Sequence, residues 1–135
     1  MPGVPAAAQV PVGGMLTSCD PGAPGPFNPY LVTTCFAKGD QNDGEPALVF
    51  LQDTNDDSGH IMGPTAGDVG AVYGLAYHSR DRDLYIGAFQ KRGTHFGPDG
   101  TGAIYRYGLE DGSISTFAVV PNAGADVHDA SDNYF

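Results

Sequence analysis

The chain has 135 residues, 41% of them hydrophobic, and a formal net charge of -10, with 6 Lys and Arg against 16 Asp and Glu. This length suits one domain with a modest core, and the acidic balance argues against nucleic acid or an anionic membrane surface as partner. No apolar run reaches the roughly 18 residues that a transmembrane helix needs, so we expect no direct membrane insertion.

Residues 1–30 predict an extended arm. Seven of the 11 prolines of the chain lie there, and proline lacks the N–H group that a strand needs for its hydrogen-bond ladder. Cys19 within this arm and Cys35 after it are the only two cysteines. Two thiols in an acidic, Gly- and Pro-rich chain are typical of a secreted protein with one disulfide, which would tie the arm to the first strand and stabilise it by about 3 kcal/mol. Two buried free thiols are the alternative. A metal site is disfavoured, because neither a CxxC motif nor paired histidines accompany them.

From Tyr30 onward the sequence predicts strands, because short runs rich in Val, Ile, Tyr, Phe and Thr alternate with Gly, Asp and Asn clusters. The expected strands cover 31–37, 47–52, 60–62, 72–78, 84–90, 102–108 and 114–120. In the run 72–77 neither alternate set of residues is polar. Such a strand belongs to a sheet that is covered on both faces.

An internal repeat sets the expected fold. Residues 31–38 align with 84–91 at an offset of 53, and residues 47–50 align with 103–106 at an offset of 56. A recurring order of strand, long loop, strand, tight turn and strand is typical of β-propeller blades. We therefore expect an all-β fold of antiparallel four-stranded blades, about one and three-quarter blades of a β-propeller, with a small β-sandwich as the alternative. The expected divisions are an arm (1–30), an incomplete first blade (31–64), a complete second blade (65–121) and an acidic tail or connection (122–135).

Three segments carry a family resemblance: 69–78 (VGAVYGLAYH), 84–92 (LYIGAFQKR) and 97–105 (GPDGTGAIY), preceded by TTCF at 33–36. Over residues 19–121 the text resembles the N-terminal blades of a β-propeller-like region in large secreted or surface-anchored bacterial proteins, adhesin-like and upstream of prealbumin-like repeats. The resemblance implies an extracellular or cell-surface location, and it transfers no catalytic residues.

The long connections of the repeat predict one elaborated rim, where a rigid scaffold would present binding residues. The candidate rim residues are Lys91, Arg92, His95, Asp99 and Asp68. Oxygen-rich loops also raise the alternative of a Ca²⁺ site, although Asp and Asn are ordinary turn residues and the stretch from Asp53 departs from an EF-hand at its sixth and twelfth positions. We expect no cofactor. The weak calcium candidates are Asp40, Asp43, Glu45, Asp53, Asn55 and Asp57.

These features favour a non-enzymatic extracellular structural or interaction module, a propeller segment of a bacterial envelope, surface or matrix protein. The alternatives are an accessory subunit docked on a larger complex and a fragment of a propeller enzyme, a lyase or hydrolase. The expected partners are other protein chains or the remainder of a longer propeller, because one face of each unit is left uncovered. We therefore expect no stable isolated monomer, whereas the sandwich alternative would give one.

Overall fold

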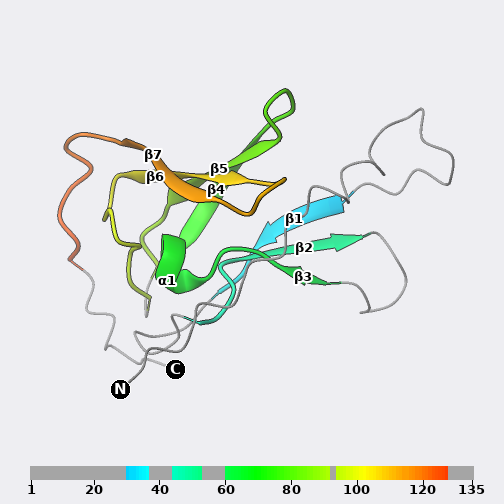
Figure 1. The fold of residues 1–135 in the computed structure, drawn as a ribbon. Helices are drawn as coiled ribbons and strands as arrows, with labels where there is room; N and C mark the ends of the chain where they lie inside the picture. The colour runs from blue at the N-terminus through cyan, green and yellow to red at the C-terminus, as the bar shows by residue number, and fades with distance from the viewer. Residues whose placement is uncertain (1–29, 37–43, 53–59, 92–93, 128–135) are drawn as a thin grey trace, which may run out of the picture.

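The computed structural model describes residues 30–36, 44–52, 60–91 and 94–127. These residues form, in chain order, β1 (Tyr30–Thr34), β2 (Leu48–Gln52), β3 (Ile61–Met62), α1 (Ala66–Val69), β4 (Val72–His78), β5 (Asp83–Ala88), β6 (Ala103–Gly108) and β7 (Ile114–Val119). The strands make a three-stranded sheet in the order β1-β2-β3 and a four-stranded sheet in the order β4-β5-β6-β7 (Figure 1). Every pairing is antiparallel.

The all-β prediction is therefore confirmed, and each expected strand is present with ends shifted by a few residues. The two sheets do not close into a barrel, and they fit the small-sandwich alternative. Nothing in the arrangement supports a β-propeller, so that interpretation is corrected: two sheets pack on each other without any ring of blades. The predicted divisions of the chain stay predictions.

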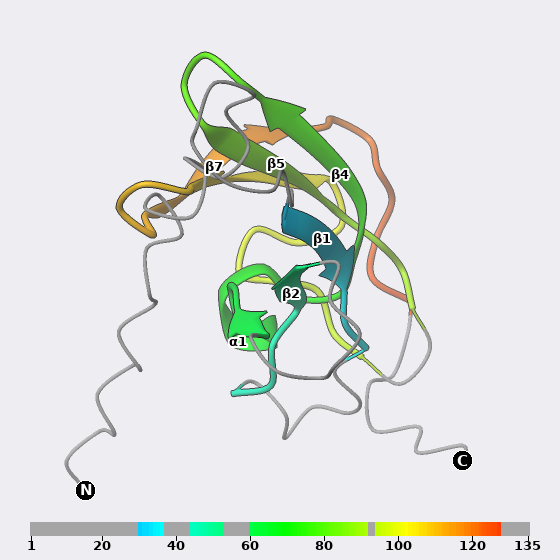
Figure 2. The ribbon, with the colours of Figure 1, turned by 90° about the vertical axis from the view of Figure 1, so that its right-hand side faces the viewer.

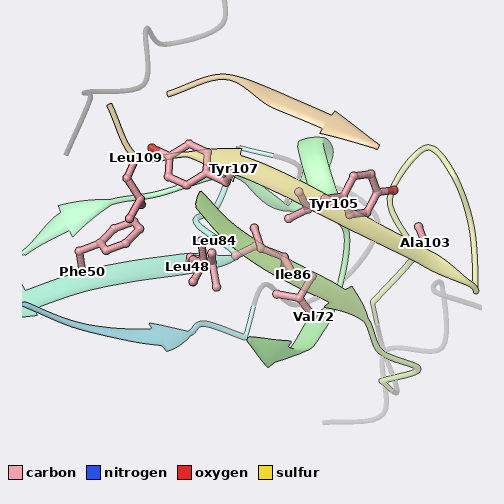
Figure 3. Close-up of a cluster of buried hydrophobic side chains, with 11 residues drawn as sticks. Leu48, Phe50, Val72, Leu84, Ile86, Ala103, Tyr105, Tyr107 and Leu109 are labelled. Carbon is pink, nitrogen blue, oxygen red and sulfur yellow. The ribbon is translucent and has the colours of Figure 1, made fainter. Parts of the chain in front are cut away.

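The core lies between the two sheets, as Figures 2 and 3 show. Alternation along β6 turns Ala103, Tyr105 and Tyr107 inward, and each of them is at most 1% exposed. From the opposite sheet, the ring of Phe50 meets that of Tyr107 at a centroid distance of 6.1 Å. The other buried members of the cluster are Ala47, Leu48, Val69, Val72, Leu84, Ile86 and Leu109.

The short helix α1 connects the two sheets. The Asp68 carboxylate accepts hydrogen bonds from the Thr65 backbone N–H at 2.9 Å and from the Thr65 hydroxyl at 2.7 Å, which holds the first turn of the helix. Gly70 ends the helix at φ +69°. A Cβ atom there would collide with the backbone of Gly97, so only glycine allows this close approach. A helix of four residues has no periodicity that the sequence could reveal.

The pairing register bears out the internal repeat. All five residue pairs of β1 and β2 map onto pairs of β5 and β6 when 53 is added to the β1 number and 56 to the β2 number. For example, Val32 faces Phe50, and Tyr85 faces Arg106. The sheets β1–β3 and β5–β7 are therefore copies of one unit with the same register, and β4 is the added strand.

The structure does not show the predicted disulfide between Cys19 and Cys35. Cys35 carries a free thiol in the structure, while Cys19 lies outside the described residues. Among the residues that the structure describes, no helix is long and apolar enough to cross a membrane.

Candidate functional site

The connections expected at the elaborated rim meet at one end of the sheets. Pro46 pairs with Thr65, and Gly70 pairs with Phe96, each as an isolated antiparallel bridge. These contacts hold the connection before β2, the helix α1 and the loop before β6 together. The rim is thus a set of tightly packed backbone segments in the part of the chain that the structure describes.

Two acidic rim candidates have structural partners. Asp68 caps α1 through Thr65. The Asp99 carboxylate accepts a hydrogen bond from the Thr116 hydroxyl at 2.6 Å, and its backbone N–H donates to the Tyr105 hydroxyl at 3.0 Å. Both carboxylates hold loops in place. His95 engages the rim through its carbonyl, which accepts a hydrogen bond from Ala71.

Lys91 lies over the aromatic ring of Phe36, with its Nζ atom 3.9 Å from the ring centroid. This cation–π contact links the end of β5 to the end of β1. Burial lowers the pKa of Lys91, and the nearby Cys35 partly opposes that shift. Burial likewise raises the pKa of the Cys35 thiol, with Lys91 acting in the opposite direction. The pair therefore favours a protonated, unreactive thiol. Arg92 lies outside the described residues.

Of the calcium candidates, the structure describes only Glu45, which is exposed at the surface. The residues Asp40, Asp43, Asp53, Asn55 and Asp57 lie outside the described ranges. Within those ranges, no three His, Cys, Asp or Glu side chains come together as a metal site would require.

A shallow groove of about 590 Å³ runs between the loop at 99–102 and the chain that leaves β7. Thr101 closes its far side, because the Thr101 hydroxyl donates a hydrogen bond to the carbonyl of Gly124 at 2.6 Å. Its lining includes the small residues Gly100, Gly102, Ala123 and Gly124.

The most distinctive surface is the outer face of the four-stranded sheet, the face turned away from β1–β3 (Figures 1 and 2). Strand alternation places on it the side chains between the buried ones, including Tyr85 and Ile104. Tyr73 is 71% exposed and Phe117 is 59% exposed. We call this surface the aromatic face; it consists of Tyr73, Gly74, Ala76, Tyr85, Gly87, Phe89, Ile104 and Phe117.

The aromatic rings of this face form two clusters. Tyr73 packs against Phe89 at 5.2 Å between ring centroids, and Tyr85 packs edge-on against Phe117 at 4.7 Å. Gly74 lies opposite Gly87 between the clusters. Because neither glycine carries a side chain, the sheet is bare there, and a shallow apolar depression of about 380 Å³ extends from these glycines to Tyr85, Ile104 and Phe117.

An ion pair lies next to Tyr85, because Arg106 is the cross-strand partner of Tyr85. The Arg106 guanidinium donates to the Asp83 carboxylate at 2.5 Å, and the carboxylate is only 3% exposed. The Asp83 hydrogen bond and charge raise the pKa of Arg106. The positive and negative charges cancel, so the aromatic face carries little net charge of its own.

The chain is similar to the colossins. It is 29% identical to Colossin-B over 64% of its own length and 2% of that relative, 33% identical to Colossin-C over 68% and 10%, and 32% identical to Colossin-A over 66% and 1%. All three are proteins of Dictyostelium discoideum. The chain thus spans no more than about a tenth of the curated relatives just named. No family model and no solved structure matches it.

These relatives correct the resemblance to bacterial adhesin-like proteins. The similar proteins are colossins of a eukaryote, so neither the bacterial origin nor the link to bacterial propeller regions stands.

The aromatic face was only half visible in the sequence. Tyr105 and Tyr107, on the opposite face of the sheet, are buried in the core. Tyr73, Phe89 and Phe117 are exposed instead. The sequence feature that could have revealed this face is the run 72–77, which is apolar in both alternate sets of residues. Such a strand is expected to have apolar neighbours on both of its faces.

Proposed function

We propose that this chain is a non-enzymatic structural module of an extracellular protein, and that it works by burying its aromatic face against another protein surface. The observation that carries the proposal is the aromatic face itself, since monomeric proteins rarely leave a large contiguous apolar patch in water. Burial of such a patch is favourable by roughly 25 cal/mol per Å².

The composition of the face fits protein contact. Tyrosine and phenylalanine are enriched at the centres of protein interfaces, where charged residues are depleted. Tyr85 and Phe117 pack on each other on this face, and the nearby charges of Arg106 and Asp83 neutralise each other in an ion pair. The similarity to the colossins, which are far longer chains, is in keeping with a module inside a large structural protein.

The polar side chains of the rim support a structural role. Asp68 stabilises a helix terminus, Asp99 anchors a loop to β7, and Lys91 lies on an aromatic ring. Each of these groups is engaged in holding the fold.

Hydroxyl-radical footprinting with mass spectrometry tests the proposal. Native material from the organism that makes the protein is compared with the dilute recombinant chain. We expect Tyr73 and Phe117 to be protected in the native material, while Val127, which is 80% exposed and outside both sheets, is labelled equally in both samples. Equal labelling of Tyr73 and Phe117 in the two samples would refute the burial of this face.

The extracellular location follows from the acidic, lysine-poor composition and is tested separately. An antibody raised against the chain should label intact cells or the culture medium. Labelling that requires permeabilised cells would place the protein inside and overturn this part of the proposal.

A further inference from the structure

We propose that the aromatic face binds a second copy of this chain, which contributes the outer face of its own three-stranded sheet, in a head-to-tail contact. This inference rests on the proposed function and names its partner. The two sheets of one chain already pack against each other through such a contact.

The internal interface joins two different faces of the repeated unit. The three-stranded sheet contributes the face that carries Val32, Leu48 and Phe50. The four-stranded sheet contributes the face that carries Leu84, Ile86, Tyr105 and Tyr107. We call the first the A face and the second the B face.

The repeat then identifies the two surfaces left open. Val32 corresponds to Tyr85 at the offset of 53, and Leu48 corresponds to Ile104 at the offset of 56, so the matching residues hold the same positions in the strand register. The aromatic face is therefore the A face of the four-stranded sheet. By the same correspondence, the outer face of the three-stranded sheet is a B face: its Leu31 and Thr33 are the counterparts of Leu84 and Ile86.

Among the described residues, no further sheet covers the open A face of the four-stranded sheet or the open B face of the three-stranded sheet, although Val49 in the middle of that B face is only 9% exposed. Leu31 on the open B face is 51% exposed and Met62 is 56% exposed. Within one molecule an A face already packs on a B face. A second copy that places its open B face on the open A face would form the same kind of contact again. A contact between unlike faces is heterologous, and it leaves one face of each kind free at the ends of a stack.

The A face of the four-stranded sheet also offers a recess that a partner side chain could fill. The A face of the four-stranded sheet has a depression where Gly87 stands in the register position of Thr34. The opposing B face offers the flexible side chains Leu31 and Met62 to fill it. Methionine in particular adapts to irregular apolar gaps.

Size and charge predict that the contact is weak. Four strands of six or seven residues cover roughly 20 Å by 19 Å at about 3.4 Å per residue and 4.8 Å per strand. That footprint is about 380 Å² per partner, below the roughly 800 Å² per partner of a standard specific interface, and the opposing sheet, with strands of 5, 5 and 2 residues, is smaller still. The net charge of -10 opposes association at low salt, so the measurement belongs at high protein concentration and about 0.15 M salt, where the Debye length is about 8 Å.

Analytical ultracentrifugation of the full chain over a concentration series tests the proposal. We expect the wild type to form dimers and longer stacks as concentration rises. Phe117→Asp damages the A face and Met62→Asp damages the open B face, so each alone should weaken association at least about tenfold, the usual effect of losing a central interface residue. Val127→Asp is the matched control: it also places a carboxylate at an exposed apolar site, outside both faces, and should associate as the wild type does.

Mixing the two damaged variants gives the decisive result. Met62→Asp keeps an intact A face and Phe117→Asp keeps an intact open B face, so an equimolar mixture should form one-to-one dimers that cannot grow. If Phe117→Asp abolishes association while Met62→Asp leaves it unchanged, the aromatic faces pair with each other and the proposal is wrong. A wild type that stays monomeric at the highest concentration also overturns it.

Phe117→Thr and Met62→Thr provide a second pair if a carboxylate disturbs folding, because threonine is well tolerated in strands. A cooperative thermal transition establishes that each variant is folded. The footprinting experiment separates the two levels of the argument: protection of Tyr73 in native material together with a monomeric isolated chain would retain the proposed function and assign its partner to another protein.

Discussion

Replacing Tyr107 by phenylalanine should stabilise the protein, although removing a buried tyrosine hydroxyl is ordinarily destabilising. Tyr107 is fully buried, and its hydroxyl has no hydrogen-bond partner in the part of the chain that the structure describes. In Figure 3 the ring lies among Phe50, Leu109 and other apolar side chains. A buried polar group without a partner costs roughly 1–3 kcal/mol.

The neighbouring inward position on the same strand supplies the control. Tyr105 is also buried, at 1% exposure, but its hydroxyl accepts a hydrogen bond from the Asp99 backbone N–H at 3.0 Å. Tyr105→Phe removes that bond and should destabilise the fold by about 1 kcal/mol. Tyr107→Phe should gain about 1 kcal/mol, because the small void left by the oxygen offsets part of the benefit. The two variants should therefore differ by about 2 kcal/mol.

Urea denaturation monitored by circular dichroism measures both free energies of unfolding. In a domain of about 100 residues, 1 kcal/mol shifts the midpoint of thermal unfolding by about 4–8 °C, so the expected difference is easily resolved. A loss of stability in Tyr107→Phe as large as that in Tyr105→Phe would refute the reasoning and would mean that the Tyr107 hydroxyl is hydrogen bonded.

Three further predictions follow from the same structure. Burial raises the pKa of Tyr105 and Tyr107. The contribution of these two tyrosines to the free energy of unfolding should therefore be constant below about pH 10 and fall as the pH rises further, by at most about 1.4 kcal/mol per pH unit for each tyrosine, because the unfolded chain loses these protons first. A pH titration of stability checks this, and a decline equally steep in the double phenylalanine variant would contradict it. Gly70→Ala should destabilise the fold by about 3 kcal/mol or more, because the new Cβ atom would collide with the backbone of Gly97. Gly100→Ala, also at positive φ but facing open space, should destabilise it by only about 1–2 kcal/mol, as measured in thermal melts. Similar losses in the two variants would argue against the close approach of Gly70 and Gly97. Cys35 should react with iodoacetamide more slowly than free cysteine at pH 8, since burial raises the pKa of its thiol. Mass spectrometry would follow the reaction in a variant whose other cysteine is replaced by serine. A faster reaction than that of free cysteine would show an activated thiolate.

Local patterns were enough to locate the strands. Runs of apolar and β-branched residues between Gly and Asp clusters predicted all seven, and the offsets of 53 and 56 anticipated the pairing register of β5 and β6 from that of β1 and β2. These features depend on residues that are near one another in sequence or that recur at a fixed spacing. They can therefore be recognised in the sequence alone.

The candidate site was harder to predict from the sequence, because its side chains contact residues that are far away along the chain. Lys91 was predicted as a binding residue, but in the structure it lies over the ring of Phe36, which is 55 positions earlier in the chain. Asp99 likewise bonds Thr116 on another strand. Spacing in the sequence carries no information about either contact.

The sequence by itself determined that this protein is all-β, that it contains two copies of one unit, and that the strand at 72–77 is apolar on both sides. Only the tertiary structure decided which side is core. Where both alternate sets of a strand are apolar, periodicity cannot distinguish the buried Ile86 from Tyr85 beside it. The packing of β1–β3 over one face made that choice, since covering one side of a sheet buries every second residue and leaves the others, with Phe117 among them, facing water.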